Sequence, residues 1–146
     1  MSLTVLQPAS AADLDLLAQG LAPSGTTLPE GGLETPDNLA MLRDLAAGIR
    51  PDFDPAAWLV LAGGENVGLL SLVKPPADGI VTTGYGIAPA RRGRGHATAA
   101  VRALCDWARQ DARLAIVAAE TGETNRPSQQ VLAANGFACT GRRDDP

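Results

Sequence analysis

The segment from Tyr85 to Thr98 holds the residue types best suited to chemistry in this chain. It runs from an apolar stretch through a turn that contains glycines and arginines, and it continues into a helical pattern. Gly93 and Gly95 allow a tight turn and a close approach of the backbone to a ligand. The helix that follows directs unpaired N–H groups and the positive end of its dipole to the same place. Together these features predict an anion site.

The arginines of this turn indicate which anion it would bind. Arg91, Arg92 and Arg94 bring their positive charges close together along the chain, and guanidinium groups pair well with phosphate oxygens. A phosphate or pyrophosphate is therefore the expected ligand. The alternative is a solvated basic turn that only caps a helix, and this segment alone does not decide between the two.

The composition of the chain excludes several classes of protein. Its 146 residues suit a single domain, residues 1–146, with a core of its own. The net charge of −4 argues against a general nucleic-acid binder. No apolar run approaches the roughly 18 residues that span a bilayer, and the Met-Ser-Leu start shows no secretory signal. We therefore expect a cytoplasmic protein that binds neither membrane nor nucleic acid.

Cysteine and histidine are too sparse to predict a metal centre. Cys105 and Cys139 are the only cysteines, and His96 is the only histidine. None of them has a partner at the spacing of zinc ligands. We expect no metal, two cysteines that serve as small apolar residues, and a place for His96 in the first helical turn near the anion.

Hydrophobic periodicity and turn residues predict the elements that position this turn. Helices are expected after Ser10, which forms a capping box with Asp13, and after Thr35, which precedes a proline at the first helical position. The clearest amphipathic helix follows Gly95, and a fourth helix follows Thr124. The expected strands comprise residues 3–6, 56–61, 67–73, 80–87, 114–119 and 137–140.

These elements predict an α+β fold. The three consecutive strands within residues 56–87 form a meander, whereas the strand–helix–strand passage over residues 80–119 requires a parallel pair. The central sheet is therefore expected to be mixed and mostly antiparallel, with about six strands and about four flanking helices.

A family resemblance extends this prediction. The segment Arg92-Gly93-Arg94-Gly95-His96-Ala97 resembles the Arg/Gln-x-x-Gly-x-Gly/Ala pyrophosphate signature of the GNAT superfamily of acyl-CoA-dependent N-acetyltransferases. Other phosphate motifs agree less well, because the Gly-Lys-Ser/Thr of an ATP-type loop is missing and the preceding strand belongs to a meander, not to the start of a Rossmann unit.

A second set of residues resembles one branch of that superfamily, the enzymes that acetylate ribosomal-protein N-termini. Glu120-Thr121, Asn125, Ser128 and Asn135-Gly136-Phe137 follow in the order of that branch, and Gly84-Tyr85-Gly86-Ile87 is similar to it as well. The resemblance covers roughly residues 60–140, and the first 55 residues agree only in the order of their elements.

The resemblance implies a GNAT fold in which the two parallel strands splay apart to hold the pantetheine arm of acetyl-CoA. Acetyl-CoA would be the acetyl donor, and the acceptor would be a primary amine on a protein N-terminus or a small molecule. The residues implied to contact the donor are Ile87, Ala88, Arg92, Gly93, Arg94, Gly95, His96, Ala97, Thr98, Asn125 and Ser128.

Glu120 is the catalytic base that the resemblance implies, because it lies at the end of the splayed strand. An α-amine has a pKa of about 8 and a lysine amine one of about 10.4, so the acceptor must lose a proton before or during its attack on the thioester. The oxyanion would be bound by a backbone N–H near Gly86 or Ile87. Alternatively, Glu120 only fixes the following loop through Thr124 or Asn125.

Ser128 is the second catalytic candidate. Many GNAT enzymes have a tyrosine that protonates the departing CoA thiolate, and the corresponding position here is Leu132. The ribosomal-protein branch also has an apolar residue at that position, which leaves the Ser128 hydroxyl as the proton donor near the thioester. The alternative is that Ser128 only caps its helix.

The end of the chain also departs from the family, whose fold usually closes with a further long strand. Only nine residues follow Phe137, so the final strand is expected to be missing. An exposed edge at the strand over residues 137–140 would then serve a homodimer contact or leave the groove more open.

The acceptor and the activity itself are less defined by the sequence. Glu30, Glu34, Asp37 and Asp78 could attract a cationic amine, although such charges are usually only solvated. The competing hypothesis for the whole chain is a CoA-binding regulatory module of the same fold without catalysis.

Overall fold

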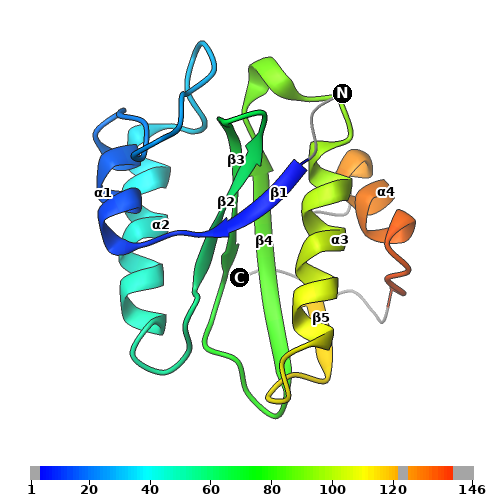
Figure 1. Ribbon diagram of the computed structural model, residues 1–146. Helices are drawn as coiled ribbons and strands as arrows, with labels where there is room; N and C mark the ends of the chain where they lie inside the picture. The colour runs from blue at the N-terminus through cyan, green and yellow to red at the C-terminus, as the bar shows by residue number, and fades with distance from the viewer. Residues whose placement is uncertain (1–3, 122–124, 140–146) are drawn as a thin grey trace.

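The computed structural model describes residues 4–121 and 125–139. One mixed sheet crosses the molecule, with α1 and α2 on one face and α3 and α4 on the other (Figure 1). The elements are β1 (Thr4–Pro8), α1 (Ala11–Ala18), α2 (Pro36–Ile49), β2 (Ala57–Ala62), β3 (Glu65–Leu72), β4 (Ile80–Ile87), η1 (Pro89–Arg91, a 3₁₀ turn), α3 (His96–Arg109), β5 (Ile116–Ala119) and α4 (Arg126–Ala134).

The first two helices begin where their capping residues predict. The Ser10 hydroxyl accepts a hydrogen bond from the Asp13 N–H at 3.1 Å, and the Asp13 carboxylate accepts one from the Ser10 N–H at 3.0 Å. Thr35 caps α2 by accepting from the Asn38 N–H at 3.2 Å, and Pro36 is the first helical residue. Both starts confirm the sequence prediction, because side-chain oxygens satisfy N–H groups that a helix cannot satisfy itself.

The sheet has the order β1-β2-β3-β4-β5, in which the first three pairings are antiparallel and β4 pairs with β5 in parallel. The mixed, mostly antiparallel sheet is confirmed, with five strands among the described residues in place of about six. The parallel pairing ends where Thr83 lies opposite Ala119, although β4 continues to Ile87. Beyond Thr83, the two strands are no longer joined by the ladder.

The strand expected over residues 137–140 is wrong for the part that the structure describes, because residues 137–139 belong to no strand. The end of α4 accounts for this difference. Gly136 adopts φ 82°, its N–H donates to the Ala133 carbonyl, and the Phe137 N–H donates to the Leu132 carbonyl. This is the hydrogen-bond pattern of a Schellman cap, which turns the chain back against its own helix. The edge proposed for a homodimer contact is therefore not formed by residues 137–139, and residues 140–146 lie outside the description.

The core is centred on the two middle strands. Leu59, Val60, Leu70 and Leu72 are all fully buried. Trp107 of α3 packs edge-to-face against Trp58 of β2, with ring centroids 5.1 Å apart. These contacts hold the C-terminal part of α3 against the sheet.

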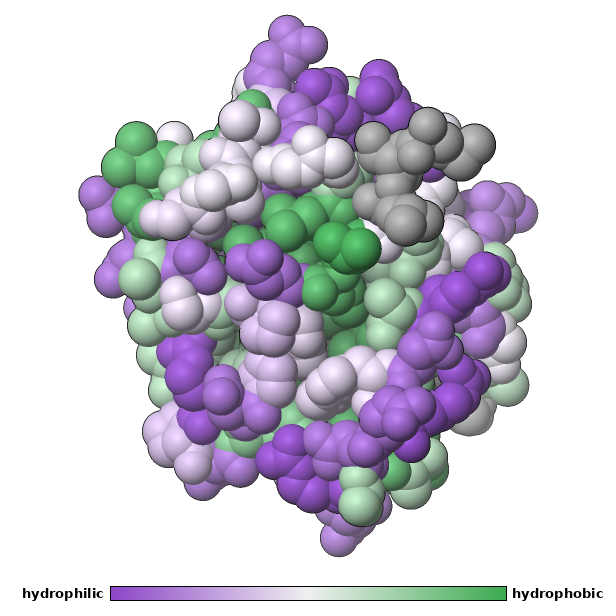
Figure 2. All heavy atoms as spheres, viewed as in Figure 1, coloured by the Kyte–Doolittle hydropathy of each residue, from purple (hydrophilic) through white to green (hydrophobic). Residues whose placement is uncertain are grey.

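The outer surface is mostly polar on the face viewed in Figure 2. Apolar surface gathers near the centre of that view. Val5 of β1 is 47% exposed. Among the described residues, no helix combines the length and apolar character needed to cross a bilayer.

Candidate functional site

The predicted anion turn lies between β4 and α3 and is open to solvent. Gly93 and Gly95 adopt φ values of 77° and 81°, a left-handed conformation that glycine reaches without strain. A Cβ added to either residue would meet no atom within 4 Å. Gly95 is also the N-cap of α3 and has no side chain to satisfy the first helical N–H groups. The backbone of the turn is therefore open to a close approach by an anion such as a phosphate group.

The three arginines of the turn do not have the same role. Two nitrogens of the Arg91 guanidinium, Nε and Nη2, donate to the two carboxylate oxygens of Glu65 on β3, at 2.7 and 3.0 Å. This hydrogen bonding lowers the pKa of Glu65 and raises that of Arg91. Arg91 was expected to help neutralise a phosphate, but it instead ties the turn to the sheet. Arg92 and Arg94 are exposed, and Arg92 Nε donates to the Ile87 carbonyl at 3.1 Å.

The backbone of β4 presents alternate peptide groups to its two neighbours. The Ala88 N–H donates to the Val67 carbonyl and the Thr82 carbonyl accepts from the Val73 N–H, so the even-numbered residues of β4 face β3. The peptide groups of Tyr85 and Ile87 consequently face the side of β5, beyond the point where the ladder with β5 ends.

This alternation distinguishes between the backbone groups that were expected to bind the acetyl donor or the oxyanion. The N–H of Ile87 faces the opening between β4 and β5, whereas that of Gly86 belongs to the side paired with β3. Ala88 is fully buried, its N–H is bonded to Val67 and its carbonyl accepts from the Arg91 N–H. The N–H of Ile87 is thus better placed for a ligand than that of Ala88.

The Ser128 hydroxyl lies at the opening, but in a different arrangement from either expectation. Asn125 is the N-cap of α4, since its Oδ1 accepts from the Ser128 N–H at 3.2 Å. The Ser128 Oγ is 2.6 Å from the Tyr85 hydroxyl, which also donates to the Ser128 carbonyl at 3.2 Å. Partial burial raises the pKa of Tyr85, and the hydrogen bond with Ser128 offsets part of this increase.

The Tyr85 hydroxyl is a candidate functional group to which the sequence analysis gave no role. Tyr85 is the only tyrosine of the chain, and the sequence offered its place in a strand and in the segment Gly84-Tyr85-Gly86-Ile87 that resembles the family. Strand alternation turns its side chain away from the face covered by α2, and the fold brings α4, more than forty residues later, against it. Nothing in the local sequence reports that contact.

The other predicted residues lie after β5 and in the first turn of α3. Glu120 follows β5 directly and is exposed. In the first turn of α3, the His96 ring places Nδ1 3.0 Å from the Thr4 hydroxyl of β1. Thr98 accepts a hydrogen bond at its carbonyl from the Asn135 amide at 3.2 Å, and Ala97 packs against the core. These contacts connect the phosphate turn to the first strand and to α4.

One carboxylate approaches β4 from the opposite face of the sheet. The Glu34 Oε2 would lie 3.8 Å from a Cβ built on Gly86, and no other atom comes within 4 Å of that position apart from its own chain neighbours. The other oxygen of Glu34 accepts from the Asn38 amide at 3.0 Å. Glu34, for which the sequence left open an attraction to a cationic amine or simple solvation, therefore holds its carboxylate over the exposed Gly86 of β4.

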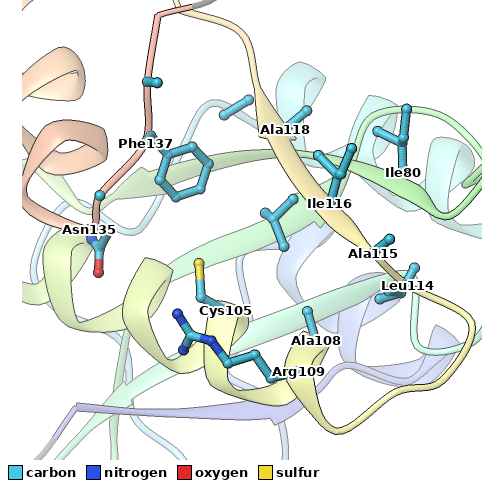
Figure 3. Close-up of a pocket in the computed structure, with 14 residues that line it drawn as sticks. Ile80, Cys105, Ala108, Arg109, Leu114, Ala115, Ile116, Ala118, Asn135 and Phe137 are labelled. Carbon is cyan, nitrogen blue, oxygen red and sulfur yellow. The ribbon is translucent and has the colours of Figure 1, made fainter.

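A separate groove lies between β5, α3 and the segment that follows α4 (Figure 3). It has a volume of about 540 Å³, is lined by β5, α3 and residues 135–138, and includes the Phe137 ring and the Cys105 thiol. Burial raises the pKa of that thiol, in keeping with the apolar role expected for Cys105. None of the residues predicted to bind the donor lines this groove. Within the described ranges, no group of three or more His, Cys, Asp or Glu side chains is arranged to hold a metal ion.

Comparison with known proteins agrees with this geometry. The family described as acetyltransferase (GNAT) domain matches residues 4–138. No curated protein shows significant sequence similarity to the chain. Among solved structures, RimL, a ribosomal L7/L12 alpha-N-protein acetyltransferase in complex with coenzyme A, is similar with a TM-score of 0.71 and 18% identity, covering 95% of this chain and 82% of that one.

Two further structures show the same fold. The aminoglycoside acetyltransferase AAC(6')-Ib in complex with ribostamycin and coenzyme A has a TM-score of 0.68 and 18% identity, over 95% of this chain and 85% of its own. A GNAT-family acetyltransferase from Bacillus anthracis has a TM-score of 0.64 and 16% identity, over 97% and 86%. At such identities the likeness concerns the fold alone.

Proposed function

The chain belongs to the GNAT acetyltransferase family, and on that basis we propose that it transfers the acetyl group of acetyl-CoA to a primary amine. The observation that carries the proposal is the juxtaposition of an open glycine turn at the start of α3 with the end of the β4–β5 ladder. The turn would bind the pyrophosphate through Arg92, Arg94 and backbone N–H groups, and the opening would receive the pantetheine arm.

The proposed reaction is a direct attack of the neutral amine nitrogen on the thioester carbonyl carbon. The new C–N bond gives a tetrahedral intermediate, whose oxyanion would accept a hydrogen bond from the Ile87 N–H. Glu120 or a water molecule takes the proton that the amine must lose. Breakage of the C–S bond then releases the CoA thiolate and leaves the acetylated amine.

Protonation of that thiolate is assigned to the hydroxyl pair of Ser128 and Tyr85. The two oxygens are 2.6 Å apart, so a proton given by Ser128 can be replaced from Tyr85, and the pair recovers it from solvent. The raised pKa of Tyr85 keeps its hydroxyl protonated at neutral pH. This arrangement explains how the chain could work with Leu132, which is buried, at the position of the family's tyrosine.

The test is the release of free CoA thiol when acetyl-CoA is mixed with a panel of amines. Aminoglycosides, polyamines, amino acids and N-terminal peptides cover the acceptors open to this fold. Amine-dependent thiol release supports the proposed function. Binding of acetyl-CoA without turnover across the whole panel would instead support a non-catalytic CoA-binding module.

A further inference from the structure

The backbone around Glu34 is held firmly on both sides. Leu33, immediately before it, is 6% exposed and part of the core, and Thr35, immediately after it, is the N-cap of α2. The Asn38 side chain, one turn into the helix, then donates to the Glu34 carboxylate at 3.0 Å. The carboxylate position is therefore defined by a buried anchor, a helix cap and a side-chain hydrogen bond.

The loop that precedes Glu34 is also attached to the sheet. The Thr27 N–H donates to the Gly64 carbonyl at 3.2 Å, and the Asn66 N–H donates to the Thr27 carbonyl at 2.8 Å. These bonds join the loop to the turn between β2 and β3, on the side of the molecule where α2 starts. Glu34 thus follows a loop that is attached to the sheet.

Glu34 faces the proposed reaction site from the side opposite to the hydroxyl pair. Successive side chains of β4 point to opposite faces, so the open position on Gly86 faces Glu34 while Tyr85 faces Ser128. The β4–β5 ladder ends at Thr83, two residues before Tyr85. A carboxylate is found on one face and two hydroxyls on the other.

We propose that the Glu34 carboxylate, over Gly86, is the subsite that binds the acceptor amine in its ammonium form. The inference rests on the proposed function and names its substrate class, amines that arrive as cations. Primary amines with a pKa of about 8 to 10.4 are mostly protonated at neutral pH, so they reach the site with a positive charge. Gly86 leaves the approach open because it has no side chain, and the acetyl group would come from the opposite face.

The test compares Glu34→Gln with Asp44→Asn. Each variant removes one negative charge, the first just before α2 and the second on the exposed side of that helix, and glutamine retains an oxygen that can accept from Asn38. For Glu34→Gln we expect the KM for the amine to rise roughly three- to tenfold, the range of a partly solvated charged hydrogen bond. The kcat and the Kd for CoA should stay within about twofold, as should all parameters of Asp44→Asn. Equal KM values for the two variants would overturn the proposal, and so would a fall in kcat at unchanged KM, which would make Glu34 a base.

Gly86→Ala provides an independent variant with the charge intact. Its methyl group would lie 3.8 Å from the carboxylate, an ordinary contact that the fold accommodates. The added group occupies the approach, so the amine KM should rise again. An unchanged KM in Gly86→Ala argues against this position of the subsite.

Calorimetry separates this inference from the proposed function. Putrescine is titrated into CoA-saturated protein, with 1,4-butanediol as the uncharged counterpart. Binding of putrescine alone, weakened by Glu34→Gln, supports the subsite even if no amine is acetylated. Turnover that is insensitive to Glu34→Gln removes the subsite and leaves the proposed function intact, and equal binding of diamine and diol also contradicts the subsite.

Discussion

Removal of the Tyr85 hydroxyl tests how the proton reaches the leaving group. Tyr85→Phe keeps the ring, which is partly buried against the core, and deletes only the oxygen that lies 2.6 Å from the Ser128 Oγ and 3.2 Å from its carbonyl. Ser128→Ala removes the other half of the pair. The comparison of these two variants shows which hydroxyl acts on the thiolate and which one acts through its neighbour.

The expected magnitudes follow from these contacts. A neutral hydrogen bond contributes about 0.5–1.5 kcal/mol net, so Tyr85→Phe should lower kcat by about 2- to 13-fold if Tyr85 only positions and recharges Ser128. Loss of the proton donor itself should cost about 10²- to 10⁴-fold, the usual range for general acid catalysis, and this loss is expected for Ser128→Ala. The double variant should be no slower than Ser128→Ala, because Tyr85 acts through Ser128.

Steady-state thiol release at saturating acetyl-CoA measures these effects, and absorbance near 295 nm follows the ionisation of the single tyrosine. The folded protein should titrate above the ordinary tyrosine pKa of about 10, because burial raises the pKa of Tyr85. Ser128→Ala should move the midpoint higher still, since the serine hydrogen bond lowers that pKa. A hydroxyl with only a structural role would move the titration but not kcat.

The raised pKa of Tyr85 also determines how the stability of the folded protein changes at alkaline pH. The folded-state pKa of Tyr85 lies above the unfolded value, so its contribution is complete below about pH 10 and is lost as the pH rises through the folded pKa. Tyr85→Phe should lack this alkaline component. Unchanged kcat in both single variants would refute the proton-delivery argument, and a larger loss in Tyr85→Phe than in Ser128→Ala would reverse the two roles.

The remaining predictions concern the turn. Gly95→Glu should abolish CoA binding in calorimetry, because a carboxylate repels the pyrophosphate. Asparagine tolerates the left-handed backbone, so the Kd of Gly95→Asn for CoA should stay within about tenfold of that of the original protein. Equal binding of CoA by both variants would contradict a phosphate at this turn. Arg94→Gln should weaken CoA binding and reduce its salt dependence, while Arg109→Gln at the far end of α3 should change neither. Glu65→Gln should flatten the acid limb of a Tm-against-pH curve. The lowered pKa of Glu65 stabilises the folded protein above about pH 4.5, and this contribution is lost as the pH falls through the folded-state pKa. Parallel curves for the variant and the original protein would show that the Glu65–Arg91 pair does not contribute.

Local signals predicted most of the secondary structure. Caps at Ser10 and Thr35 and the alternation of apolar residues act over a few positions, so they can be read without knowing the fold. The one strand that failed, over residues 137–139, is apolar but short, and the Asn135-Gly136 pair before it directs the chain into a helix cap. The turn signal outweighed the apolar pattern because it satisfies carbonyl groups at the end of α4 immediately.

The sequence did not predict which charged and hydroxyl side chains pair with one another. The sequence suggested Arg91 as a phosphate ligand, and the fold pairs it with Glu65, twenty-six positions away. Long-range neighbours of this kind depend on strand register, which shifts every side chain to the other face when it changes by one residue.

By itself, the sequence determined the glycine turn before α3, the order of the elements and the parallel β4–β5 connection, because each depends on neighbouring residues or on chain connectivity. Only the tertiary structure decided which side chains meet at the end of the β4–β5 ladder. Packing and alternation along β4 brought Tyr85 to Ser128 on one face and opened Gly86 towards Glu34 on the other. The physical reason is that neighbouring residues set the backbone conformation. The contacts of a site, by contrast, form between residues that are far apart along the chain and come together only when the elements pack.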